Sequence, residues 1–298
     1  MRPRLLVTGA SGMLGSRVCR QALNGWAVTG IQCRNRTAVD GIQTVQLDLT
    51  HLPRLEELFQ AAAPKAVIHT AAISQPARCE ADPDVAHAIN VAVSEVLAML
   101  CARRRIPFIF TSTDLVFDGL KAPYDEGHPA SPVCVYGRQK LEAEKAVLQR
   151  YPAALVCRLP LMFGLGHSPS ANFSVQMLDA IRQGLPIDLL TDEFRTPVDY
   201  ESAARGMLHL LGRAHGILHL GGGTRLSRYA LGCLMARHMA VSPAMLRPVT
   251  LDQLPSAVKR SPDCSLDSRA ARAMGYDPAP LDAAVKRVVD HYKVISKS

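Results

Sequence analysis

Tyr136 and Lys140 are the two residues whose types and spacing most directly indicate proton transfer. They lie four positions apart in a predicted helix over residues 136–150, so both side chains share one helix face. A nearby ammonium group favours the phenolate form, and we therefore expect Lys140 to lower the pKa of Tyr136. Such a phenol would donate a proton to a carbonyl group under reduction. The alternative, since this spacing arises easily among seven tyrosines, is a partly buried Tyr beside a surface Lys.

Two hydroxyl residues, Ser112 and Thr113, follow an apolar run over residues 107–111 that predicts a buried strand. Ligands of open parallel sheets bind at the carboxyl ends of the strands. A hydroxyl there is able to hydrogen-bond a substrate carbonyl and to share its proton with Tyr136. The alternative is that these hydroxyls only cap a turn.

A glycine-rich turn with Gly9, Gly12 and Gly15 joins the first predicted strand to the first predicted helix. The first glycine permits a tight turn, the second a close approach to a pyrophosphate, and the third close packing of the helix on the sheet. The helix N-terminus then offers N–H groups and a positive dipole end to the anion. The turn therefore predicts a dinucleotide site, and the alternative is an ordinary glycine-rich turn without a ligand.

The residues after the second predicted strand bear on which nicotinamide cofactor is bound. An acidic residue there would bind the adenosine ribose and repel a 2′-phosphate. This chain has Arg34 and Arg36 instead, and guanidinium groups pair well with phosphate. We therefore predict NADPH as the cofactor, with NADH as the alternative if both arginines are only solvated loop residues.

The elements that must position these residues alternate along the first half of the chain. Strands are predicted over residues 4–8, 26–33, 44–47, 66–69, 107–111 and 154–158, and helices over 13–23, 52–62, 84–104 and 136–150. This alternation predicts an α/β fold, a Rossmann doubly wound parallel sheet with a smaller C-terminal substrate lobe. We expect residues 1–160 to form the dinucleotide-binding domain, with about 196–222 returning to its sheet, and residues 161–298 to form mainly the substrate lobe.

The composition narrows the class of protein. The 298 residues carry a net charge of +8, but only 5% are aromatic, too few for a base-stacking platform, so we expect no nucleic-acid partner. The eight cysteines form no CxxC pair, which predicts reduced thiols in the cytoplasm and no metal site. We find no signal-peptide pattern and no apolar run near the roughly 20 residues of a membrane helix, so we expect no membrane association.

Four motifs together resemble the extended short-chain dehydrogenase/reductases, and more narrowly the dTDP-4-dehydrorhamnose reductase group. They are the turn Gly9–Gly15, the segment Ser112–Gly119, the segment Pro132–Lys140, and the segment Arg158–Gly164. The resemblance implies a cytoplasmic oxidoreductase of dTDP-rhamnose biosynthesis. Hydride would pass from NADPH, or from NADH, to the 4-keto group of a nucleotide-activated 6-deoxysugar. A homodimer is compatible with this family.

The resemblance also implies roles for individual residues. Tyr136 would be the acid, Lys140 would support it and bind the cofactor, and Thr113 would orient the carbonyl. The cofactor would be bound by Gly9, Ser11, Gly12, Met13, Leu14, Arg34, Arg36, Asp48, Leu49, Ala71, Ala72, Ile73, Tyr136 and Lys140. The substrate would be bound by Ser112, Asp114, Val116, Phe117, Asn172 and Arg195, with Arg195 as a phosphate clamp or as one partner of a surface salt bridge.

Two alternatives stay open beside the reductase. The chain has Leu161 where rhamnose-forming reductases typically carry an aromatic residue, so the usual sugar-stacking surface is missing. The same branch of the superfamily includes a non-catalytic, NADP-binding regulatory subunit of methionine adenosyltransferase, which is one alternative. A nucleotide-sugar epimerase or dehydratase is the other, because dehydratases carry an acid beside the catalytic Thr, as Asp114 is here.

Overall fold

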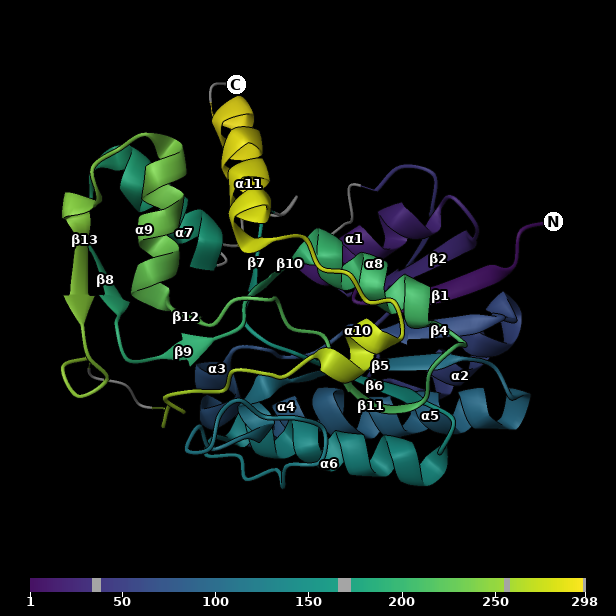
Figure 1. The fold of residues 1–298 in the computed structure, drawn as a ribbon. Coiled ribbons are helices and arrows are strands. Elements are labelled where there is room, and N and C mark those ends of the chain that lie inside the picture. Colours follow the sequence, from purple (N-terminus) through teal and green to yellow (C-terminus); the bar gives the residue numbers. More distant parts are fainter. Residues whose placement is uncertain (34–38, 166–172, 255–257, 297–298) are drawn as a thin grey trace.

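A parallel sheet of seven strands forms the centre of the computed structural model, which describes residues 1–33, 39–165, 173–254 and 258–296 (Figure 1). The strand order is β11-β6-β5-β4-β1-β2-β3, and every neighbouring pair is parallel. The strands are β1 (Arg4–Thr8), β2 (Ala27–Gln32), β3 (Gln43–Gln46), β4 (Ala66–His69), β5 (Phe108–Thr113), β6 (Leu155–Leu159) and β11 (Gly216–His219). The predicted doubly wound α/β fold is confirmed.

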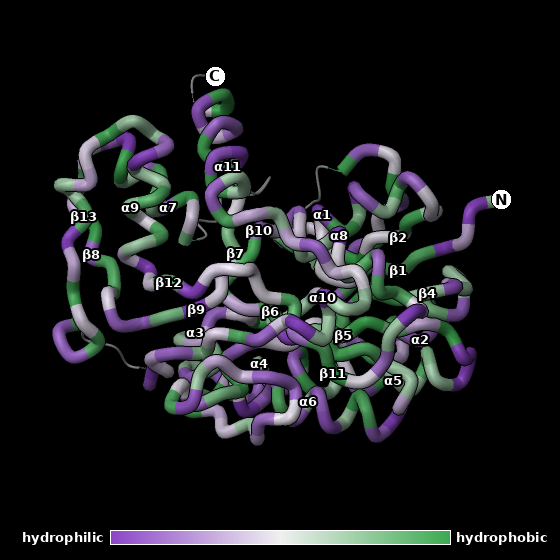
Figure 2. Tube along the Cα trace, in the orientation of Figure 1, coloured by the Kyte–Doolittle hydropathy of each residue, from purple (hydrophilic) through white to green (hydrophobic). Residues whose placement is uncertain are grey.

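Helices cover both faces of this sheet because alternate side chains of each strand point to opposite faces. Leu5 and Val7 of β1 pack on one face under α1 and α8, while Leu6 packs on the other under α2, α5 and α6. These helices are α1 (Met13–Ala22), α2 (Leu52–Ala62), α5 (Val93–Arg104), α6 (Val135–Arg150) and α8 (Tyr200–Leu210). Figure 2 shows hydrophobic residues along the central strands and hydrophilic residues along the outer loops.

The helix predicted over residues 84–104 is continuous but changes its winding. It consists of α4 (Pro83–His87), a π-helical turn (Ala88–Ala92) and α5, and it follows the short α3 (Pro76–Ala81). By length and composition, this stretch is also apolar enough to cross a membrane, which our search for an apolar run missed. Half of that stretch is buried inside the protein, as is typical of a core helix.

A second, smaller apolar core lies in the C-terminal lobe, at the left of Figure 1. It is enclosed by α7 (Phe173–Gln183), α9 (Arg228–Met239), α11 (Leu281–Ile295), β8 (Ile187–Leu190) and β13 (Leu246–Val249). Short elements link it to the sheet: β7 (Met162–Phe163), β9 (Phe194–Arg195), β10 (Val198–Asp199), β12 (Leu226–Ser227) and α10 (Arg269–Ala273). Strands of two residues have no sequence periodicity, so the sequence did not predict them.

The described residues contain neither a disulfide bond nor a cluster of metal-ligating side chains. All eight cysteines are free, and only Cys33 is exposed. Within the described ranges, no group of three or more His, Cys, Asp and Glu side chains is placed to hold a metal ion.

We expect the fold to lose stability when a glycine of the turn is replaced by a residue with a Cβ atom. A Cβ atom on Gly15 would lie 2.1 Å from the carbonyl oxygen of Gly9, whereas a Cβ on Gly25 would have no heavy atom within 4 Å. Overpacking of this kind typically costs 1–3 kcal/mol, so Gly15→Ala should lower the free energy of unfolding by about that amount. Urea unfolding measures the difference, and equal losses for Gly15→Ala and Gly25→Ala would contradict this packing.

Candidate active site

The predicted site residues gather at one edge of the sheet, because parallel strands end at the same edge. The glycine turn follows β1, Ala71–Ile73 follow β4, and Thr113 is the last residue of β5. Helix α6 begins beside them and carries Tyr136 in its first turn.

The glycine turn is tight enough to exclude side chains. Gly9 has a φ of +68°, and a Cβ there would lie 2.8 Å from the backbone nitrogen of Ala71. Gly12 is the N-cap of α1 and, as a glycine, contributes no capping side chain. A turn whose glycines leave the backbone open at a helix N-terminus fits the pyrophosphate of a dinucleotide.

Asn90 holds the loop after β4 in place beside this turn. Its side chain, buried in the π-helical turn, accepts a hydrogen bond from the Ile73 N–H (2.9 Å) and donates one to the Ile73 carbonyl (3.2 Å). It also donates to the amide oxygen of Gln139 in α6 (3.0 Å). The loop predicted to line the cofactor is thereby tied to the helix that carries Tyr136 and Lys140.

Two other predicted cofactor residues, Asp48 and Leu49, lie just after β3. Asp48 follows β3 and accepts hydrogen bonds from the backbone N–H and the hydroxyl of Thr50 (3.0 and 2.8 Å). Leu49 is buried beside it. Arg34 and Arg36, and the predicted substrate residue Asn172, lie outside the described residues.

Thr113 and Tyr136 lie next to each other in the structure, and Lys140 follows Tyr136 by four residues on α6. Tyr136 is 8% exposed and Lys140 is 1% exposed. The Thr113 side chain lies close enough to the Tyr136 phenol to act on its pKa, which it lowers. The Lys140 amine lies 4.0 Å from the centre of the Phe110 ring, in a cation–π contact below Tyr136 on the same helix face.

The titration of this pair differs from our expectation. Burial, with Asp114 next, raises the pKa of Tyr136 above its usual value, so the expected lowering by Lys140 was wrong. Burial also lowers the pKa of Lys140 to about 7, against the opposing charge of Glu144. The reason is desolvation, which disfavours both charged forms and which sequence spacing does not report. Tyr136 is thus held as a protonated acid, the form that donates a proton.

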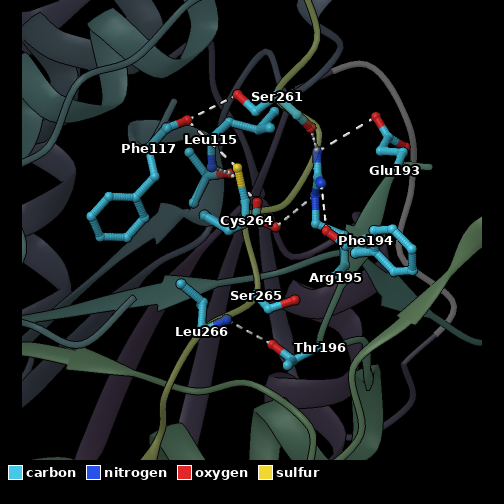
Figure 3. A network of polar contacts seen from close by, with 12 residues as sticks. Leu115, Phe117, Glu193, Phe194, Arg195, Thr196, Ser261, Cys264, Ser265 and Leu266 are labelled. Atoms are coloured by element: carbon cyan, nitrogen blue, oxygen red, sulfur yellow. Dashed lines mark hydrogen bonds and ion pairs between the residues drawn. The ribbon is translucent and has the colours of Figure 1, made fainter. Parts of the chain in front are cut away.

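Arg195 is engaged inside the protein, which corrects our expectation of a phosphate clamp or surface salt bridge. Its guanidinium is 4% exposed and lies 3.1 Å from the Asp114 carboxylate and 3.5 Å from that of Glu193. It also donates to the carbonyls of Phe194 (2.6 Å) and Ser261 (3.1 Å), as Figure 3 shows. A buried guanidinium must satisfy its donors within the fold.

The structure also corrects the predicted orientation of three further residues. Val116 and Phe117 have no exposed surface, and Phe117 stacks on Tyr124 with 4.1 Å between ring centres. The Phe117 carbonyl accepts from Ser261 (2.9 Å), which fixes this segment against the 261–266 loop (Figure 3). Ser112 is also buried, and its hydroxyl donates to Glu144. These side chains support the site from the core instead of facing a sugar.

Asp114 is the buried acid beside Thr113, and its surroundings predict a pH effect on stability. Burial raises the pKa of Asp114 to about 6 even though Arg195 opposes the shift. Between pH 4 and 6 the folded protein therefore keeps this proton while the unfolded chain loses it. The free energy of unfolding consequently falls as the pH rises through this window. Asp114→Asn should not show this pH-dependent fall, because asparagine does not titrate.

We expect the unfolding free energy of Asp114→Asn, relative to the original protein, to rise between pH 4 and 6 and then level off. Urea unfolding at half-unit pH steps measures it. A relative stability that stays flat from pH 4 to 7 would contradict the buried placement of this acid.

Comparison with known proteins agrees with this architecture. A family model described as RmlD substrate binding domain matches residues 2–294. Methionine adenosyltransferase 2 subunit beta of Xenopus laevis is 32% identical over 280 residues, covering 91% of this chain and 82% of that protein. A probable low-salt glycan biosynthesis reductase, Agl14, of Haloferax volcanii is 37% identical over 209 residues, covering 69% of each chain.

Among solved structures, the dTDP-4-dehydrorhamnose reductase of Bacillus anthracis in complex with NADP superposes with a TM-score of 0.85 at 20% identity. The superposition covers 98% of this chain and all of that one (100%). At this identity the match supports the fold. The family model, in contrast, spans nearly the whole sequence, and the chain therefore belongs to the RmlD substrate binding domain family.

Proposed function

We propose that this protein is a reductase that uses NADPH to reduce the 4-keto group of a nucleotide-activated 6-deoxysugar, a substrate most like dTDP-4-dehydrorhamnose. The observation that carries the proposal is that Thr113 and Tyr136 lie together at the sheet edge that also carries the glycine turn, with the buried Lys140 one turn further along α6. Such a set, an acid, a hydroxyl that orients a carbonyl and a buried amine, is suited to proton transfer to a carbonyl oxygen.

The cofactor site is proposed from the turn after β1. The backbone of Gly9–Leu14 would hold the pyrophosphate, Ala71–Ile73 would line one side of the cofactor, and Lys140 would bind the ribose. When bound, the nicotinamide supplies the hydride. The NADP complex of the Bacillus anthracis reductase supports NADPH as the cofactor, and NADH is the second choice.

The chain's own residues supply the proton and the orientation. The Thr113 hydroxyl would hydrogen-bond the substrate carbonyl oxygen and keep it beside the Tyr136 phenol. Tyr136 would donate its proton to that oxygen as negative charge develops on it. Lys140, in its protonated form, would favour the tyrosinate that remains, because a nearby cation stabilises an anion in a dry site.

We expect Tyr136→Phe to keep its affinity for NADPH but to lose about 10²–10⁴-fold in kcat, the usual contribution of a general acid. The assay follows NADPH oxidation with dTDP-4-keto-6-deoxysugars, and fluorescence titration reports cofactor affinity. Tyr151→Phe, at the other end of α6, is the matched control and should keep its rate. An unchanged kcat for Tyr136→Phe would remove this phenol from the mechanism, and turnover of no nucleotide 4-ketosugar would reject the reductase.

The second candidate is a regulatory subunit that binds NADPH without turnover. The 32% identity to methionine adenosyltransferase 2 subunit beta, over 91% of this chain, favours it. Gel filtration of the purified chain with a methionine adenosyltransferase catalytic subunit tests this function directly. Co-elution without any NADPH oxidation would support the subunit, whereas separate elution with turnover would support the reductase.

A further inference from the structure

A row of three buried polar side chains crosses the carboxyl edge of the sheet, one strand beside the next. Ser112 of β5 pairs in register with Arg158 of β6, and Arg158 pairs with His219 of β11. Their exposed fractions are 5%, 3% and 0%. Polar groups this deeply buried need partners, and the row lies directly below the end of β5 that carries Thr113.

Glu144 of α6 covers this row and binds two of its members. One of its carboxylate oxygens accepts from the Ser112 hydroxyl and from the Arg158 Nε (3.0 Å), and the other accepts from the Arg158 Nη2 (2.7 Å). The carboxylate itself is buried, with 2% of the side chain exposed. Because a bidentate pair has one favourable geometry, Glu144 fixes the position of α6 along the ends of β5 and β6.

His219 completes the row without adding a charge. Burial, with Arg158 next, lowers the pKa of His219 to about 4, so the ring is neutral at pH 7. Its Nδ1 lies 3.1 Å from the Tyr124 carbonyl and donates to it, which leaves Nε2 as an acceptor facing Arg158 at 3.4 Å. The row therefore holds one cation, Arg158, and one anion, Glu144.

Glu144 also lies one helical turn beyond Lys140, and residues four apart on a helix are neighbours. The other titratable groups around Lys140 in the described residues include Cys79 on α3 and His69 on β4, whose charges couple to that of Lys140, and Tyr136, four residues earlier on α6. Burial raises the pKa of the Tyr136 phenol and the Cys79 thiol and lowers the pKa of His69 to about 3, so all three are neutral at pH 7. Among these groups, only Glu144 supplies negative charge.

We propose that Glu144 is a positioning residue: through Ser112 and Arg158 it sets the register of α6 on the sheet, and its carboxylate supplies the charge that keeps the Lys140 amine protonated. This goes beyond the proposed function and rests on it only for the role of Lys140. The Glu144 carboxylate forms the buried ion pair with Arg158 and also lies on the face of α6 that carries Lys140.

Titration of Lys140 itself tests the charge role without substrate or cofactor. In protein labelled with ¹³C at the lysine ε-carbons, the Lys140 resonance is identified by its absence in Lys140→Met. We expect a midpoint near pH 7 in the original protein and a midpoint lower by about 1 unit or more in Glu144→Gln, which keeps the shape but loses the charge. Glu144→Asp should keep the higher midpoint, and so should Ser112→Ala, which removes a hydrogen bond but no charge.

Loss of packing alone would raise this midpoint, because burial lowers the pKa of Lys140. If Glu144→Gln leaves Arg158 unpaired and does not fold, the double variant Glu144→Gln with Arg158→Met removes both buried charges and should show the same lowered midpoint. A Lys140 midpoint in either folded variant within about 0.3 units of the original would overturn the proposal. Absence of ketosugar reduction would reject the proposed function but would leave this titration as a valid test.

Discussion

The position of helix α6 on the ends of β5 and β6 is the constraint on which the site depends. Tyr136, Lys140 and Glu144 follow one another at intervals of four residues, so a small rotation of the helix would displace all three together. The bidentate pair between Glu144 and Arg158 opposes such a rotation from one end. At the other end, Gly137 allows close approach, because a Cβ there would lie 2.2 Å from the Leu115 carbonyl oxygen.

The cofactor side of the site is coupled to the same helix. Asn90 joins the Ile73 backbone to Gln139, and Gly9 packs its backbone against Ala71. A dinucleotide placed on the β1 turn would therefore meet a loop whose position is already set by α6. Preorganisation of this kind reduces the rearrangement that the reacting groups must make and so favours a defined geometry for proton transfer.

The sequence predicted the parallel sheet, the alternation of strands and helices, and the shared helix face of Tyr136 and Lys140, because these follow from periodicity, glycine positions and a four-residue spacing. It did not predict the environment of the charged groups. The Arg195 guanidinium donates to the carbonyl of Ser261, 66 residues further along the chain. The Ser261 hydroxyl in turn donates to the carbonyl of Phe117, which lies 144 residues earlier. The raised pKa of Tyr136 likewise comes from burial, which depends on packing between distant segments.

We propose that this chain catalyses hydride transfer from NADPH to a sugar carbonyl, with Tyr136 as the acid. This transfer is tested most directly by a single turnover with NADPH that carries deuterium at the reduced carbon of the nicotinamide, followed by mass spectrometry of the nucleotide sugar. We expect the product to retain one deuterium and the cofactor to end as NADP⁺. A changed sugar without deuterium and with the cofactor returned as NADPH, or bound cofactor with no change in any nucleotide 4-ketosugar, would contradict it.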